Sequence, residues 1–286
     1  MSRQAGKREL LESLRRDLSC FESPRAQAPS LSLGAPEVDQ RLSGGAGLSL
    51  AGLHEVVGAA YPDMAAATGF AIALGSRLVM RETRSLVWVT QRSGVHDLGP
   101  LYGPGLAMMG LDPARVLIVS AKDDREALWV TEEALRTPDL CGVVSELEGS
   151  RAYDLKASRR LQLAAERFER PALLLAGHAG SAASAPSAAL TRFRIASAAS
   201  SPNSSPNPSV VSAPGRARFA VTLDRVRGGS SSQFILEWNH AAHCFSVASP
   251  FFRREDGTAG RDAAKRDRPP ARPQEHASVS RLAVSA

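Results

Sequence analysis

The chain is short of cysteine, lysine and aromatic residues. Its three cysteines, Cys20, Cys141 and Cys244, lie far apart and form no CxxC pair, which excludes a disulfide framework and fits a reducing cytoplasm. Aromatic residues make up 5% of the 286 residues, whereas 43% are hydrophobic. The sequence therefore predicts a sizeable core built mainly from aliphatic side chains.

Only four of the 35 basic residues are lysines, so arginine dominates the positive charge behind the formal net charge of +6. So modest an excess permits contact with nucleic acid or an acidic partner but requires neither. The charged N-terminus, MSRQAGKRELLESLRRDL, has no apolar stretch typical of a signal peptide, and no run of 18 apolar residues is free of charged or polar breaks. We therefore expect a cytoplasmic protein without a membrane-spanning helix.

The shortage of lysine matters most at residues 52–74, around which the rest of the chain is organised. Residues 52–58, GLHEVVG, predict a short buried strand that ends in a glycine, and residues 64–80 predict a helix of small and apolar residues. A strand, a glycine loop and a helix in this order form the phosphate-binding P-loop unit. Its loop should read G-x-x-x-x-G-K-[ST], in which amides and the lysine hold phosphates and the hydroxyl holds magnesium.

The loop departs from that pattern at three of its four defining positions. Gly58 is retained, but Asp63 replaces the second glycine, Met64 the lysine and Ala65 the hydroxyl residue. Asp63 puts a carboxylate at a helix N-terminus that would otherwise attract phosphate, although it is also suited to cap that helix. Met64 cannot offset phosphate charge, and Ala65 cannot bind magnesium. Taken alone, the loop is equally consistent with a strand, loop and helix that never bound phosphate.

Further apolar strands alternate with helices along the chain. We expect strands at 85–91, 115–120, 141–147 and 171–177, helices at 36–42, 123–136 and 155–168, and a helix at 98–110 that is interrupted by Gly103, Pro104 and Gly105. Strands that are apolar throughout and alternate with helices indicate a parallel sheet covered on both faces. The predicted fold class is therefore α/β, with a mostly parallel sheet flanked by helices.

The pattern changes after residue 177. Residues 191–197, 218–227 and 233–239 alternate between apolar and polar side chains, and the last two stretches predict an antiparallel hairpin that closes one edge of the sheet. Residues 198–214 are rich in Ser, Pro, Asn and Ala, and we expect a mobile low-complexity loop there. Residues 251–286 have little apolar content and predict a disordered basic tail.

Residues 1–30 form an N-terminal part that precedes a core of residues 31–250. Within this part, residues 4–21 predict an amphipathic helix whose apolar stripe consists of Leu10, Leu14, Leu18 and Phe21. A linker at residues 23–30 separates this helix from the core. The helix can therefore pack on a neighbouring molecule or fold back on its own core, and the sequence leaves both positions open.

The order of these motifs resembles that of RecA recombinases. LSLGAPEVDQRLSGGAGLSLAGLHEVVG is similar to the glycine-rich segment that leads into their ATP-binding loop, and SLVWVTQ, VLIVSA, CGVVSEL and PALLLAG follow in a similar order, within residues 31–247. More closely, TRFR (191–194), VRGG (226–229) and ILEW (235–238) resemble the ImuA family, which are RecA-like accessory proteins of bacterial error-prone translesion synthesis. The resemblance implies a RecA-like core.

The resemblance also implies where an ATPase site should lie, and those positions are altered. Ser145 stands where RecA-like ATPases carry an acidic residue for magnesium, and Gln91 is the nearest match to their catalytic glutamate. A glutamine can orient water but cannot accept its proton. Together with the altered loop, three parts of one site are weakened. We therefore expect a chain that kept the fold, is not an enzyme and holds neither a nucleotide cofactor nor a metal.

The resemblance implies a non-catalytic accessory subunit of SOS-induced translesion DNA synthesis and DNA-damage mutagenesis. Its expected partners are an ImuB-like Y-family polymerase homologue, an error-prone replicative-type DNA polymerase and, as a further candidate, RecA, with DNA contacted indirectly. Candidate partner-binding residues are the N-terminal stripe and a set of tail arginines: Leu10, Leu14, Leu18, Phe21, Arg253, Arg254, Arg266 and Arg268. Two alternatives stay open, namely an active DNA-dependent ATPase with an unusual phosphate loop and a cell-division inhibitor resembling SulA, whose family is much shorter.

Two other clusters carry weaker signals. The motif NHAAHC places His240, His243 and Cys244 within five residues, but this spacing matches no known closed zinc site. The helix near residues 157–170 has a basic face that could touch phosphates or face water, formed by Arg159, Arg160, Arg167 and Arg170. Residues 177–189 correspond to a loop that holds DNA in RecA, and their lack of lysine, arginine and aromatic residues argues against recombinase-type DNA binding.

Overall fold

The computed structural model describes residues 29–91, 99–148, 152–178, 186–200, 215–228 and 231–249. All of them belong to the first of two units of the chain, Met1–Phe252. The predicted N-terminal helix at 4–21, most of the predicted loop at 198–214 and the predicted tail at 251–286 lie outside the described residues.

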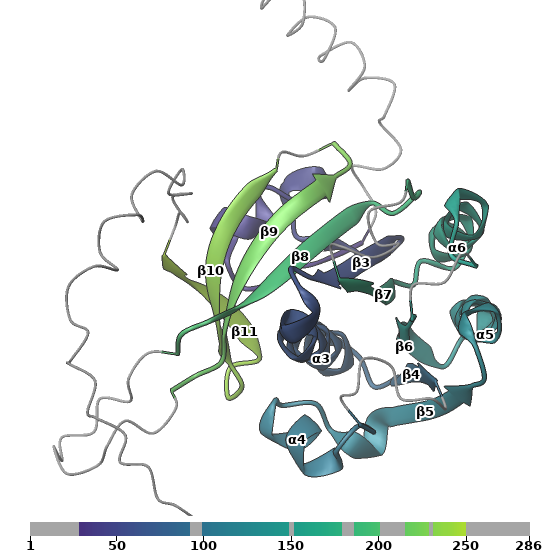
Figure 1. The fold of residues 1–286 in the computed structure, drawn as a ribbon, viewed down its shortest axis with the longest axis horizontal. Coiled ribbons are helices and arrows are strands. Elements are labelled where there is room, and N and C mark those ends of the chain that lie inside the picture. The colour runs from purple at the N-terminus through teal and green to yellow at the C-terminus, as the bar shows by residue number, and fades with distance from the viewer. Residues whose placement is uncertain are drawn as a thin grey trace, which may run out of the picture. The chain divides into compact units, whose positions relative to one another are not determined.

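A nine-stranded sheet forms the centre of the fold, in the order β11-β10-β9-β8-β3-β7-β6-β4-β5 (Figure 1). Six neighbouring strands, from β8 to β5, run parallel to one another. Their bounds are β3 Leu53–Gly58, β4 Ser85–Gln91, β5 Val116–Ala121, β6 Leu140–Glu146, β7 Ala172–His178 and β8 Thr191–Ala198. The predicted α/β class with a mostly parallel sheet is confirmed.

Three antiparallel strands extend the sheet beyond β8: β9 Arg218–Val226, β10 Ser232–Asn239 and β11 Cys244–Ser249. The predicted hairpin is β9–β10, but it does not close the edge, because β11 pairs with β10 outside it. The sequence signal for β11 is weak, since CFSVAS is short and carries small and polar residues. Before β3, the strands β1 Ser30–Leu31 and β2 Leu48–Ser49 form a separate two-stranded sheet.

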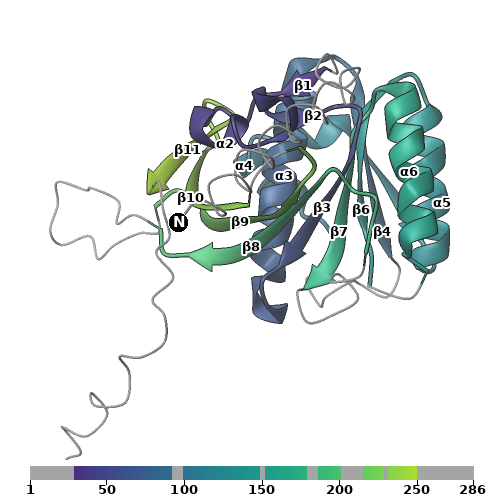
Figure 2. The ribbon, with the colours of Figure 1, turned by 90° about the horizontal axis from the view of Figure 1, so that it is seen from above.

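Helices cover both faces of the parallel strands (Figure 2). The helices α5 Asp124–Arg136 and α6 Leu155–Phe168 lie side by side on one face, where they pack on Val87, Val143 and Leu174. On the other face α3 Met64–Arg81 packs on Trp88 and Leu173. Neighbouring residues of one strand thus pack on opposite faces of the sheet, because successive side chains of a strand alternate between its two faces. This arrangement places the loop between β3 and α3 at the carboxyl edge of the parallel strands.

Helix α3 lies close to the sheet because one side of it carries small residues. Ala67, Ala71 and Gly75 recur at intervals of four and are buried. A side chain on Gly75 would place its Cβ 2.9 Å from a methyl group of Leu86 on β4. Either α3 or the Leu86 side chain would then have to shift. The stretch Tyr61–Arg81 is long and apolar enough to span a membrane by length and composition, but 56% of its apolar window is buried inside this fold.

The short helices correct one detail of the sequence interpretation. The predicted helical piece near residue 36 is α2, Pro36–Asp39. The predicted interruption at Gly103, Pro104 and Gly105 is wrong, because these residues begin α4, Gly103–Met108. Proline is well tolerated in a first helical turn, where its missing amide would have no partner within the helix.

Aromatic side chains are few but gather where α3 meets the antiparallel strands. The ring of Phe70 on α3 lies 5.4 Å from Phe193, 5.7 Å from Phe219 and 5.2 Å from Phe245. Trp238 on β10 lies 4.8 Å from Phe245. The expectation of a mainly aliphatic core is therefore wrong for this part of the molecule, where β8, β9, β10 and β11 are joined to α3 through ring contacts.

A buried ion pair links the central strands on the face that carries α6. The Glu55 side chain on β3 is fully buried, and its carboxylate accepts a 2.5 Å hydrogen bond from Nε of Arg192 on β8. The hydroxyl of Tyr153 donates a 2.5 Å hydrogen bond to the other carboxylate oxygen. Burial, reinforced by the Glu55 charge, raises the pKa of Tyr153, so this side chain stays a neutral donor.

We predict that Arg192→Met lowers the free energy of unfolding by about 3 kcal/mol, because it leaves a buried carboxylate without its cation. Arg194→Met is the matched control on the same strand, because Arg194 pairs with Asp224 at the surface, where side-chain exposures are 37% and 27%. It should cost less than about 1 kcal/mol. Adding Glu55→Gln to Arg192→Met should recover part of the loss in urea titrations. Equal losses for the two arginine variants would contradict this account.

A buried histidine makes the fold sensitive to acid. Nε2 of His54 on β3 donates to the carbonyl of Ser49 over 2.7 Å, while Nδ1 has no hydrogen-bond partner among the described residues. Burial lowers the pKa of His54 from 6.5 to about 4, against the opposing effect of that hydrogen bond. The folded chain therefore keeps the ring neutral at pH values at which the unfolded chain protonates it.

Between pH 6.5 and pH 4 the unfolded chain takes up a proton that the folded chain does not. Stability is therefore lost as pH falls through this window, by about 3 kcal/mol in total, and His54 has no effect above it. We predict that His54→Gln, which keeps a donor for the Ser49 carbonyl, removes this loss. Denaturant titrations at pH 7, 5.5 and 4 measure it as the difference between the parent chain and the variant. Parallel curves for the two proteins would show that His54 is not the source.

Candidate functional site

The candidate site lies at the carboxyl end of β3, where the chain turns into α3. A 3-10 helix, η3 Tyr61–Asp63, connects the two elements. The amide of Ala59 donates to the carbonyl of Ile195 on β8 over 2.7 Å, which holds the start of the loop against the neighbouring strand. The structure therefore contains the predicted strand, loop and helix in the predicted place.

Gly58 is required by the way the loop folds back over the strand end. A Cβ at this position would lie 2.8 Å from the sulfur of Met64 and 2.9 Å from the carbonyl oxygen of Ala60. Met64 is itself only 1% exposed. Its side chain thus lies beneath the loop, in contact with the strand end, whereas the lysine of a working P-loop must reach phosphates above the loop.

Asp63 joins the start of α3 to β8. Its Oδ1 accepts hydrogen bonds from the amide of Ser197 over 2.9 Å and from the hydroxyl of Ser197 over 2.8 Å. The prediction that Asp63 caps α3 is wrong, because its carboxylate is turned toward β8 rather than toward the amides of the helix. A negative charge is nevertheless held at the helix N-terminus, where a phosphate would have to bind. Ala65, in the first turn, is exposed and offers no hydroxyl for a metal.

At the end of β6, where the family resemblance places a magnesium ligand, the chain has Ser145 followed by Glu146. Ser145 is fully buried, and its hydroxyl has no hydrogen-bond partner among the described residues. Glu146, which follows it, accepts a 2.7 Å hydrogen bond from Nε1 of Trp88. Burial raises the pKa of Glu146, and the hydrogen bond from Trp88 opposes that rise.

Gln91, the nearest match to a catalytic glutamate, has a structural role. Its amide nitrogen donates to Oδ1 of Asp124 over 2.5 Å and to the carbonyl of Glu146 over 3.3 Å, and the residue is 5% exposed. Oδ1 of Asp124 also accepts a hydrogen bond from the amide of Glu148 over 2.8 Å. The amide of Gln91 thus ties β4 to the start of α5 and to the end of β6.

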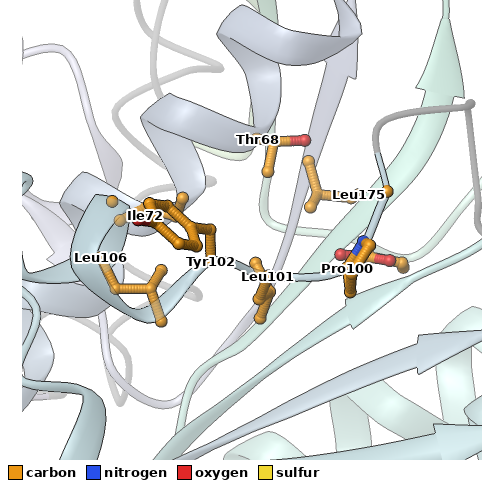
Figure 3. A pocket seen from close by; sticks show the side chains of 10 residues that line it. Thr68, Ile72, Pro100, Leu101, Tyr102, Leu106 and Leu175 are labelled. Atoms are coloured by element: carbon orange, nitrogen blue, oxygen red, sulfur yellow. The ribbon is translucent and has the colours of Figure 1, made fainter.

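A cavity of about 220 Å³ opens next to these groups, between α3 and the segment that leads into α4. Figure 3 shows Thr68 and Ile72 of α3 facing Leu101 and Tyr102 across it, with Leu175 of β7 nearby. The lining is mostly apolar, and Glu146 contributes a carboxyl group. Small-molecule sites usually measure about 300–1,000 Å³, so the cavity is too small for a nucleotide and closer in size to one side chain.

The two histidines of the motif NHAAHC lie in different surroundings. His243 is half-buried, and its Nδ1 lies 2.8 Å from the hydroxyl of Ser76 on α3, while its carbonyl accepts a hydrogen bond from Arg77. His240 is exposed. Among the residues that the structure describes, no three His, Cys, Asp or Glu side chains are placed to hold a metal ion. His243 instead fixes the turn between β10 and β11 on α3.

The basic face of α6 is largely engaged within the protein. Arg170 donates to three backbone carbonyls, Arg160 pairs with Glu132 over 2.5 Å, and the guanidinium of Arg167 lies 5.4 Å from the centre of the Phe168 ring. Arg159 lines a groove beside α6. The predicted basic helix face therefore consists mostly of side chains that stabilise the fold.

Some predicted residues lie outside the described part of the chain, and two contacts that the structure shows were not predicted. The candidate partner-binding residues of the N-terminal stripe and of the tail are outside, and they remain predictions. The Asp63–Ser197 contact and the Glu55–Arg192 pair were missed, although a charged residue within an apolar strand is a signal that a partner should exist on a neighbouring strand.

Two proteins of known name are similar to this chain in sequence. No family model matches the sequence. Protein ImuA of Caulobacter vibrioides strain NA1000 / CB15N is 38% identical over 228 residues, which cover 77% of this chain and 87% of that protein. Protein ImuA of strain ATCC 19089 / CIP 103742 / CB 15 matches to the same extent. This identity and coverage agree with the resemblance in residues 31–247, and the chain belongs to the ImuA family.

Proposed function

We propose that this protein is a non-catalytic, cytoplasmic accessory subunit of SOS-induced translesion DNA synthesis, which acts through protein contacts and does not turn over nucleotide. The proposal that the protein is non-catalytic rests on the residues in the loop after β3. Asp63 holds a carboxylate at the helix N-terminus, and Met64 is buried beneath the loop.

The electrostatics of the loop oppose ATP binding. Two like unit charges 4 Å apart repel by about 1 kcal/mol in water and by about 4 kcal/mol near a protein surface. Asp63 adds such a repulsion, and Met64 removes the attraction of similar size that a lysine would supply. A micromolar site binds with only about 8 kcal/mol, so two unfavourable changes of about 1–4 kcal/mol each weaken it strongly.

Three positions that serve hydrolysis in RecA-like ATPases also argue against turnover here. Ala65 and Ser145 cannot supply the magnesium ligands of a RecA-like ATPase, and the amide of Gln91 is bound to Asp124. The ATPase alternative would require each of these groups to be replaced by a residue from elsewhere in the chain.

Edge strand β5 supports a role in protein contacts. Its outer edge faces away from β4, and two large aliphatic side chains on it are exposed, Leu117 by 56% and Ile118 by 51%. Such an edge can accept a strand from another chain through its free backbone groups. We propose this edge as the contact for an ImuB-like Y-family polymerase homologue, with an error-prone replicative-type polymerase and RecA as further partners in the same assembly. DNA would then be contacted through these partners.

We predict that the purified protein shows no saturable ATP binding up to about 1 mM in calorimetry with magnesium present, because phosphate charge is not offset. The matched control is the triple variant Asp63→Gly, Met64→Lys and Ala65→Thr, which restores the loop pattern and should gain measurable binding. Micromolar binding by the parent chain would contradict the proposal.

We also predict that Leu117→Lys with Ile118→Lys abolishes co-purification with a co-expressed ImuB-like polymerase homologue, because charged side chains on an edge strand prevent strand addition. Met80→Lys is the control, because Met80 is 57% exposed at the end of α3. It should leave the complex intact. A complex that survives the double change would remove β5 from the interface.

A further inference from the structure

The cavity between α3 and α4 contains a carboxyl group that has no cation beside it. Oε1 of Glu146 accepts the hydrogen bond from Nε1 of Trp88, and no described group donates to Oε2. Among the described residues that line the cavity there is no lysine or arginine. A carboxylate that is taken out of water costs free energy unless a cation or hydrogen-bond donors meet it. The cavity therefore lacks the positive charge that would complement its acidic group.

The walls of the cavity are apolar and suit a long side chain better than a hydrated ion. Ile72 of α3, Leu106 of α4 and Leu175 of β7 form part of them, and Thr68 adds a hydroxyl (Figure 3). The ammonium group of a lysine is compact and strongly hydrated, whereas the guanidinium group of an arginine is more weakly hydrated. Because the walls replace that water only with apolar groups, the lining favours arginine over lysine.

An exposed aromatic ring lines the same cavity. Tyr102, at the start of α4, is 70% exposed. Its ring rests against the backbone at Gly105, because a Cβ built there would lie 3.4 Å from Cδ1 of Tyr102. Guanidinium groups stack on the faces of such rings. The ring is thus held in place on one side and open to a cation on the other.

The lining also distinguishes a side chain of a protein from a free amino acid. The α-carboxylate of free arginine would need a cation of its own, and the described lining residues include none. An arginine within a peptide has no such carboxylate. Since the cavity measures about 220 Å³, it can take the side chain while the peptide backbone stays outside.

We propose that this cavity is the docking site for an arginine side chain of a partner protein. The guanidinium forms an ion pair with Glu146 and lies against the Tyr102 ring, and the stem of the arginine packs on Ile72 and Leu175. The inference extends the proposed function, because it gives the chemistry that one partner must present. It uses none of the residues of the β5 edge or of the loop after β3, so it can fail while the proposed function stands.

A titration of the full chain followed by NMR tests this site. The indole N–H of Trp88 donates to Glu146 and therefore reports on that carboxylate. The chain has three tryptophans, and the Trp88 resonance is the one that is lost in Trp88→Phe. N-acetyl-arginine N-methylamide should shift this resonance with half-saturation at about 1–10 mM, as expected for so small a ligand. Trp129 lies on α5, on the opposite face of the sheet, and its resonance should stay in place.

The citrulline compound with the same caps is the matched control probe, because it has the shape of arginine without the charge. It should cause no saturable shift of the Trp88 resonance. An equal response to citrulline, or a titration with the arginine compound that does not saturate, would overturn the proposal.

Variants assign the response to the two groups that the proposal names. Glu146→Gln keeps an oxygen for the Trp88 N–H but removes the charge, so it should weaken binding of the arginine compound about tenfold. Tyr102→Ser should weaken binding about threefold, because it removes the ring contact. Glu37→Gln is the matched control, since Glu37 is exposed on α2, and it should bind as the parent does. Unchanged binding by Glu146→Gln would remove the carboxylate from the site and overturn the proposal.

Two further probes test the identity of the occupant. The lysine compound with the same caps and free arginine should each bind about threefold more weakly than the capped arginine. Equal or tighter binding of the lysine compound would overturn the assignment to arginine. Tighter binding of free arginine would show a site for a small molecule and overturn the assignment to a protein side chain.

Discussion

Close packing of α3 against the sheet is the constraint on which the rest of the fold depends. The helix contacts β3, β4, β6, β7 and β8, so both the parallel strands and the start of the antiparallel extension rest on it. Ala67, Ala71 and Gly75 permit this approach, and Phe70 on the same helix joins the ring cluster under β9 and β11. One helix thus packs in two ways. Its small residues let the parallel strands lie close to it, and its phenylalanine ring fills the wider space below the antiparallel strands.

The same packing gives structural roles to the residues of the loop between β3 and α3. Gly58 fits here because the turn folds tightly over the strand end and leaves no room for a Cβ. Met64 completes the core under that turn, and Asp63 fixes the turn to β8 through Ser197. Each altered residue therefore has a structural role of its own, so a fold can survive after a site on it has changed.

Most of the fold could be predicted from the sequence, because its strands and helices have strong local signals. The helix at 155–168 was placed at its observed bounds, since its apolar residues recur at helical spacing and Asp154 caps it. Strand β11 was missed because CFSVAS lacks a clear pattern. The links made by Asp63 and Glu55 could not be predicted, since their partners Ser197 and Arg192 are more than 130 residues away in sequence. The loop between β3 and α3 was located correctly, but the directions of its side chains depend on those distant contacts.

The order of strands in the sheet also governs when the molecule can fold during its synthesis. Strand β3 is made early, yet its two neighbours, β7 and β8, begin only at Ala172 and Thr191. Until those residues leave the ribosome, the centre of the sheet has two open edges, and the Glu55 carboxylate lacks its cation, Arg192. Long-range parallel pairing of this kind folds slowly and leaves apolar edges exposed in the meantime. Both edges of β3 therefore stay open while more than a hundred residues are translated, from Gly58 to Ala172.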